Sequence, residues 1–153
     1  MDFLKKYKSI FIGVAVVVLL ILMFGGGKGP EKVAKSYMNA ILDGDAKKVV
    51  KLTSDETIES SGIETKKLFI NYMEKELDDA IEYYEDKYGD NWKYKVKVID
   101  SYDCSDEMLE DGKFVVVFLE VNHKGSGWLN DKEGTEEFEL ILKKEGGKWK
   151  FYE

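Results

Sequence analysis

The sequence predicts an α+β domain in which three helices pack on one face of a curved antiparallel sheet of about four strands, preceded by a transmembrane helix. Three observations predict this class. The N-terminal region contains one long uncharged segment, residues 30–88 have apolar residues at helical spacing, and residues 92–153 have apolar residues in alternation or in short continuous runs. The 153 residues provide enough chain for one ordinary domain.

The segment Ser9–Gly27 carries no charge over 19 residues and predicts a single membrane-spanning helix in the lipid bilayer. Such a helix spans roughly 28 Å, close to the ~30 Å hydrocarbon core. Three lysines lie within residues 1–8 and Lys28 alone follows, so the positive-inside rule places residues 1–8 in the cytoplasm. A cleaved signal peptide is the alternative, although an Ala-x-Ala pattern is missing. In both cases we expect residues 31–153 to form an extracytoplasmic domain after a short tether at 28–30.

Three helices are predicted in the first half of the exported part. Pro30 suits the first turn of the first helix, and the sequence Asp43-Gly44-Asp45 ends that helix and caps a short second one. Residues 53–62 are predicted to be a polar connection. A long third helix is then predicted from about residue 64 to 88, with Gly89 as its C-terminal cap.

Four antiparallel strands are predicted in the second half. In residues 92–98 apolar side chains alternate with three lysines, which is typical of a strand with one face on the core and one in water. Residues 114–119 form a continuous apolar run that suits a strand covered on both faces. Residues 138–143 alternate again, and Gly146-Gly147 then turn the chain into a last strand at 149–152.

Several segments of the exported part carry a family resemblance: the opening helix at 30–37, the Asp-Gly-Asp turn within 40–45, the second helix at 49–52, and the Gly-Gly-Lys-Trp hairpin within 143–150. With these features the chain resembles the nuclear transport factor 2-like superfamily, a cone-shaped α+β fold that includes ketosteroid isomerases. It is most similar to small exported bacterial members of unknown function, many of them lipoproteins. The resemblance implies the fold but not the chemistry, because the superfamily contains enzymes, binding proteins and scaffolds.

We expect the exported domain to bind a small apolar ligand or a protein partner at the cell envelope. A curved sheet over helices leaves a space, and apolar pockets with a few hydroxyl groups suit small hydrophobic ligands. The side chains expected to line this cavity are Tyr37, Ile41, Phe69, Tyr72, Met73 and Phe114. If the space is filled, the loop at Trp128 and Leu129 is the expected partner-binding surface, unless Trp128 folds back onto the core.

Two other functions are weighed against this one. The first is a structural subunit of an envelope secretion or conjugation assembly. The second is an isomerase-like enzyme, which needs an Asp base and Tyr donors in an apolar cavity. Residues of these types are Tyr37, Tyr72, Tyr102, Asp100 and Asp103, but no spacing selects them, and we expect no enzymatic activity.

The composition argues against several kinds of partner. The chain has 23 lysines and no arginine against 30 acidic residues, and its formal net charge is −7. An acidic domain repels phosphates at long range and its lysines form no nucleic-acid motif, so we expect no nucleic-acid partner. No cofactor motif is present, and a single His cannot begin a zinc triad, so we expect no cofactor and no metal.

Three remaining features are interpreted as structural. His123 follows a strand and is expected at the surface beside a loop. Cys104 has no nearby lysine that would lower its pKa and is expected to be a small, inert residue near a strand end. The acidic clusters at 78–90 and 100–111 lack the order of an EF-hand and are expected to be solvated.

Overall fold

The computed structural model describes residues 28–127 and 129–153. The predicted membrane segment Ser9–Gly27 lies outside these residues, as does Trp128. Among the described residues, no helix combines the length and the apolar character needed to cross a membrane.

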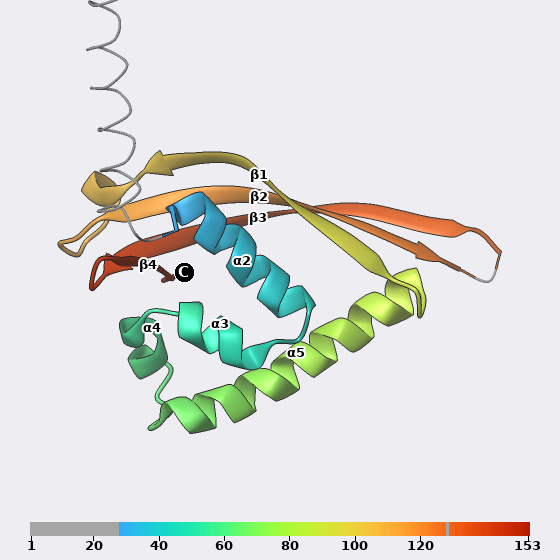
Figure 1. Ribbon diagram of the computed structural model, residues 1–153, viewed down its shortest axis with the longest axis horizontal. Coiled ribbons are helices and arrows are strands. Elements are labelled where there is room, and N and C mark those ends of the chain that lie inside the picture. Colours follow the sequence, from blue (N-terminus) through green and yellow to red (C-terminus); the bar gives the residue numbers. More distant parts are fainter. Residues whose placement is uncertain (1–27, 128) are drawn as a thin grey trace, which may run out of the picture.

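The described residues fold into four helices and one four-stranded antiparallel sheet in the order β1-β2-β3-β4 (Figure 1). The elements are α2 (Pro30–Leu42), α3 (Ala46–Leu52), α4 (Asp55–Ser60), α5 (Lys66–Tyr88), β1 (Lys93–Asp103), a 3-10 turn (Ser105–Glu107), β2 (Phe114–Ser126), β3 (Asp131–Glu145) and β4 (Lys148–Phe151). The α+β class and the four strands are confirmed. The prediction of three helices is wrong, because the predicted polar connection at 53–62 contains α4.

Local capping and burial together explain α4. The Ser54 side chain accepts a hydrogen bond from the backbone N–H of Thr57 at 3.1 Å, which is a typical N-cap. Its one buried side chain, Ile58, packs with Val50 and Phe69 of the neighbouring helices. A single apolar residue in six gives no helical periodicity, so only the cap marks this helix in the sequence.

The helices lie against one face of the sheet. Figure 1 shows α2 directly beneath the strands, α3 and α4 farther from them, and α5 running diagonally toward the far end of the sheet. The main core fills the space between α2, α3 and the sheet. Its completely buried side chains are Ala34, Val49, Val117, Leu119, Val121 and Leu142.

The apolar run of β2 is covered on both faces, as predicted. Val117 and Leu119 point toward the helices and belong to the main core. Phe114 and Val116 lie on the opposite face, where they pack with Cys104 beneath the 3-10 turn. Alternation along one strand therefore supplies two separate apolar clusters.

The predicted alternation in β1 is confirmed for the lysines and for Val96. Lys93, Lys95 and Lys97 are exposed, whereas Val96 is 2% exposed. Val98 was expected in the core but is 36% exposed. It lies on an edge strand beside a register shift, where cover from the helix layer is incomplete.

The expectation that His123 lies at the surface is wrong, because β2 continues to Ser126 and His123 is 1% exposed. Its ring stacks on Tyr84 and Tyr88 of α5, with centroids 4.6 and 5.0 Å away. Trp92 Nε1 donates to His123 Nδ1 at 3.0 Å. The Nε2 atom therefore carries the proton and donates to a Glu136 carboxylate oxygen at 3.1 Å. This cluster fastens the C-terminal end of α5 to the sheet.

Protonation of His123 conflicts with this arrangement. Burial lowers the pKa of His123, although the Glu136 carboxylate acts in the opposite direction. A second proton on Nδ1 would also face the N–H of Trp92, so the hydrogen bond between the two rings would be lost.

A change of Val96 to Asp should unfold the domain, whereas Lys95→Glu should change the free energy of unfolding by less than about 0.5 kcal/mol. An unpaired carboxylate at a buried position costs several kcal/mol, a large part of a total stability of about 5–15 kcal/mol. Urea unfolding of the full chain in neutral detergent measures both effects. Equal effects of the two changes would show that the faces of β1 are assigned incorrectly.

Acid should weaken the fold through His123, the one histidine of the chain. Its pKa is lower in the folded state, so the unfolded chain binds the proton more readily. The contribution of His123 to the free energy of unfolding is therefore fully present above about pH 6.5. It falls as the pH drops toward the pKa of the folded state. In a pH series of urea titrations, His123→Gln should flatten this slope and lower stability at neutral pH by about 1–3 kcal/mol. An unchanged slope would contradict the assignment.

Candidate functional site

Three of the six predicted cavity residues belong to the filled main core. Tyr37 is 6% exposed and its ring stacks on Phe151, with centroids 4.3 Å apart. Burial raises the pKa of Tyr37 to about 12, so the hydroxyl is neutral at ordinary pH. Ile41 and Met73 pack against the same cluster.

The other three residues lie elsewhere. Phe69 belongs to a separate cluster with Val50 and Ile58. Tyr72 is 49% exposed. The expectation for Phe114 is wrong, because the alternation of β2 places it on the sheet face opposite the helices. The structure thus does not bring the six side chains to one cavity.

The loop residue Leu129 is 79% exposed at the tip between β2 and β3. Its predicted companion Trp128 lies outside the described residues. The structure therefore supplies one exposed apolar side chain at this tip.

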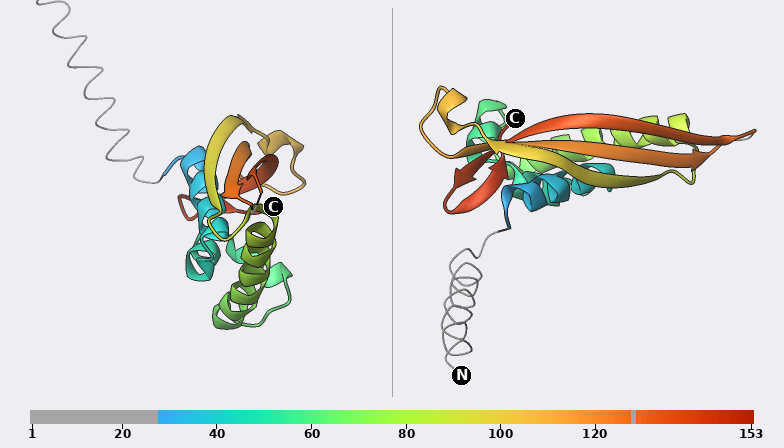
Figure 2. Two further views of the ribbon diagram at one scale, coloured as in Figure 1. Left: turned by 90° about the vertical axis from the view of Figure 1, so that its right-hand side faces the viewer. Right: turned by 90° about the horizontal axis from the view of Figure 1, so that it is seen from above.

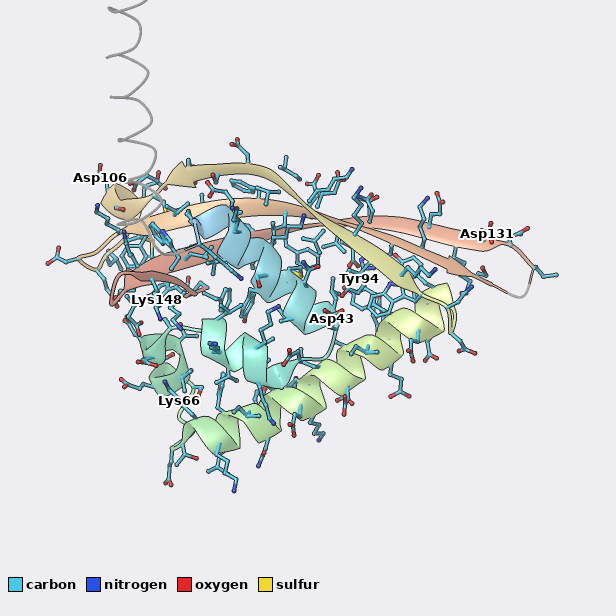
Figure 3. The ribbon with its side chains drawn as sticks, viewed as in Figure 1. Asp43, Lys66, Tyr94, Asp106, Asp131 and Lys148 are labelled. Carbon is cyan, nitrogen blue, oxygen red and sulfur yellow. The ribbon has the colours of Figure 1, made fainter. Side chains whose placement is uncertain are left out.

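The Asp and Tyr side chains weighed for an isomerase do not converge either. Tyr102 stacks on Phe118, on the sheet face turned away from the helices, whereas Tyr37 lies on the helix side. A different pair does form, because the Tyr94 hydroxyl donates a hydrogen bond to the Asp43 carboxylate (labelled in Figure 3). Burial and the Asp43 carboxylate raise the pKa of Tyr94. This exposed contact joins the end of α2 to β1.

Cys104 is 4% exposed, in agreement with its expected structural role. Burial raises the pKa of its thiol, and the charges of Glu107 and Asp103 act in the same direction. Among the described residues, no group of three or more His, Cys, Asp or Glu side chains is arranged to hold a metal ion.

A groove of about 580 Å³ lies between α2, α3 and β4, and sequence reasoning did not find it. Lysines dominate its lining, with Asp45 as the one carboxylate. The lysines are Lys28, Lys47, Lys48, Lys51, Lys148 and Lys150. Val33, Leu52 and Trp149 form an apolar part of the wall. We call this site the lysine groove.

The β3–β4 hairpin brings the C-terminal lysines to the groove. Gly146 and Gly147 have φ angles of 55° and 79°, which permit a two-residue turn that pairs Glu145 with Lys148. Figure 2 (right) shows this hairpin beside the beginning of α2. The Lys150 ammonium donates to the backbone carbonyl of Lys51 and ties β4 to the end of α3.

Helix α3 supplies the middle of the groove. Val49 and Val50 are buried, whereas Lys47 and Lys48 before them and Lys51 after them are exposed. Asp45, at the start of this helix, accepts a hydrogen bond from the backbone N–H of Lys48 at 3.0 Å. Its carboxylate therefore acts as a helix cap as well as lining the groove.

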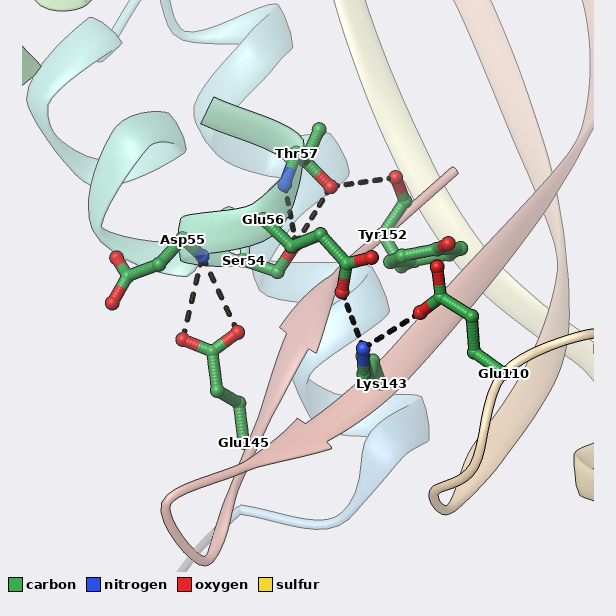
Figure 4. A network of polar contacts seen from close by, with 8 residues as sticks. All are labelled: Ser54, Asp55, Glu56, Thr57, Glu110, Lys143, Glu145 and Tyr152. Carbon is green, nitrogen blue, oxygen red and sulfur yellow. Dashed lines mark hydrogen bonds and ion pairs between the residues drawn. The ribbon is translucent and has the colours of Figure 1, made fainter. Parts of the chain in front are cut away.

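The acidic residues nearest to the hairpin are occupied elsewhere (Figure 4). Both carboxylate oxygens of Glu145 accept from the backbone N–H of Asp55 at 3.3 Å. Glu56 and Glu110 both pair with Lys143, the latter at 3.0 Å. These contacts engage the three carboxylates with partners that do not line the lysine groove.

Within residues 28–127 and 129–153, none of the six groove lysines forms an ion pair with a carboxylate. Lysines elsewhere do form such pairs, for example Lys66 with Asp55 at 2.7 Å. Six lysines and one aspartate line the groove, and Asp55 also lies within electrostatic range of Lys150. This excess of ammonium groups over carboxylates in the lining favours an anion, although the chain as a whole is acidic.

No protein-family model matches the chain, and no curated protein matches it. The resemblance to the nuclear transport factor 2-like superfamily consequently stays a prediction.

Proposed function

We propose that the chain is a membrane-tethered, extracytoplasmic domain that binds an anionic ligand with an apolar part in the lysine groove. One observation carries this proposal: six lysines without carboxylate partners among the described residues surround a groove with a single aspartate, in a chain of net charge −7. Scattered solvated lysines would not concentrate positive charge in this way.

The chemistry of the lining indicates the ligand class. Lysine ammonium groups are point charges with rotatable donors, and they bind phosphate or carboxylate oxygens without fixed bidentate geometry. Trp149, Val33 and Leu52 offer apolar contact next to these charges. The volume of about 580 Å³ lies in the range of small-molecule sites. An amphiphilic anion fits this combination better than the small apolar ligand expected from sequence.

Support for the tether comes from the sequence. Ser9–Gly27 is uncharged and long enough to span a bilayer, and the lysines within residues 1–8 favour an inside N-terminus. We also propose that the domain belongs to the nuclear transport factor 2-like superfamily. The α2–turn–α3 opening and the Gly-Gly-Lys-Trp hairpin that support this assignment both occur in the structure as regular elements.

The tether predicts the behaviour of the full chain in cells. The protein should stay in the membrane fraction after carbonate washing, and protease added from outside should remove residues 31–153. Recovery of a soluble exported chain that begins near Lys28 would show that the segment is cleaved.

The groove predicts selective binding of a soluble anionic lipid. The full chain in neutral detergent should bind dihexanoyl phosphatidylglycerol in a calorimetric titration and should not bind dihexanoyl phosphatidylcholine. The triple change Lys47→Gln, Lys51→Gln and Lys148→Gln should weaken binding about tenfold, because each lost charge contact contributes about 0.5 kcal/mol.

The matched control removes three exposed lysines outside the groove. The triple change Lys75→Gln, Lys93→Gln and Lys95→Gln alters the net charge equally and should leave the affinity within about twofold. Equal weakening in the two triple variants would mean that the groove has no special role.

A further inference from the structure

We propose that the anion held by the lysine groove is the phosphate headgroup of anionic phospholipids in the same membrane that holds the tether. The domain would then rest on its own membrane through this groove. The inference rests on the proposed function, and it commits the site to one ligand source.

The first argument is the position of the groove along the chain. Lys28 lines the groove and directly follows the predicted membrane segment. Only residues 28 and 29 precede α2, which begins at Pro30. Two residues reach at most roughly 7 Å, which is less than the Debye length of about 8 Å at physiological ionic strength. The Lys28 end of the groove therefore stays within electrostatic range of the headgroups.

The second argument is the distribution of charge along the molecule. Figure 3 shows Lys148 at one end of the long axis and Asp131 at the other. The 13 residues of β2 extend over roughly 43 Å, several Debye lengths. Acidic groups toward the far end, such as Asp131, are thus screened from a surface at the groove, whereas Asp106 lies at the Lys148 end (Figure 3).

The third argument concerns binding strength and the local supply of ligand. A lysine close to an anionic leaflet strengthens binding by about fivefold. Trp149 is half-buried in the groove wall, and tryptophan favours the membrane interface, where one part of its ring system is apolar and the other is wet. The tether keeps headgroups at a high effective concentration next to the groove, whereas a free anion has to be captured from solution.

A lysine-labelling experiment on the full chain tests this inference. The protein is reconstituted into phosphatidylcholine vesicles with or without phosphatidylglycerol and treated with a membrane-impermeant acetylating reagent. Mass spectrometry then gives the acetylation rate of each lysine. Lys47, Lys51 and Lys148 should react at least about threefold more slowly in the anionic vesicles. Lys124 and Lys132, at the far end, should react at equal rates in both.

Three outcomes would overturn the inference, and they differ in what they leave standing. Equal rates in both vesicles, with protection of the groove lysines by added glycerol 1-phosphate, would show that the groove binds a free phosphate and not the membrane. Equal rates in both vesicles without protection by glycerol 1-phosphate would remove the anion site itself. A uniform slowing of all lysines in anionic vesicles would indicate non-specific adsorption and would also reject the inference.

Discussion

The burial of the central strand β2 on both faces is the constraint on which the rest of the structure depends. Its apolar run needs cover from the helices on one side and from other parts of the chain on the opposite side. The C-terminus contributes to both, since Phe151 stacks on Tyr37 and Tyr152 packs edge-on against Phe114 at 5.3 Å. Because Phe151 and Tyr152 pack on opposite faces of the sheet, β4 is held beside α2 and α3. The β4 residues Lys148 and Lys150 therefore line the groove.

Hydrogen bonds to α4 also hold the end of β4 and the residue that follows it in place. The Ser54 backbone N–H donates to the Phe151 carbonyl at 2.8 Å, and Thr57 Oγ1 donates to the Tyr152 carbonyl at 2.8 Å. Glu145 is turned toward α4 in the same region. The contacts that stabilise the C-terminus therefore also bind Glu145, so Asp45 is the one carboxylate in the lining of the groove.

Patterns within one element were readable from sequence, and contacts between distant elements were not. Alternation and helical spacing predicted the strands and three of the four helices, because these patterns depend on residues close in the chain. The prediction that Phe114 faces the helices was wrong, because a continuous apolar run does not reveal which of its residues point to which face of the sheet. His123 was misplaced because β2 is longer than its apolar run. Lys28 and Lys148 line the same groove although they lie far apart in the sequence, and no local pattern predicts such an arrangement.

The most direct test of the account is whether the groove lysines act together as an anion site. Lysine ammonium signals in ¹H–¹⁵N spectra of the full chain, in neutral micelles, can be followed during a titration with glycerol 1-phosphate. The account predicts that Lys47, Lys51 and Lys148 shift along one common binding curve while the paired Lys66 and Lys143 do not shift. Shifts spread evenly over all lysines, or no shifts at all, would contradict it.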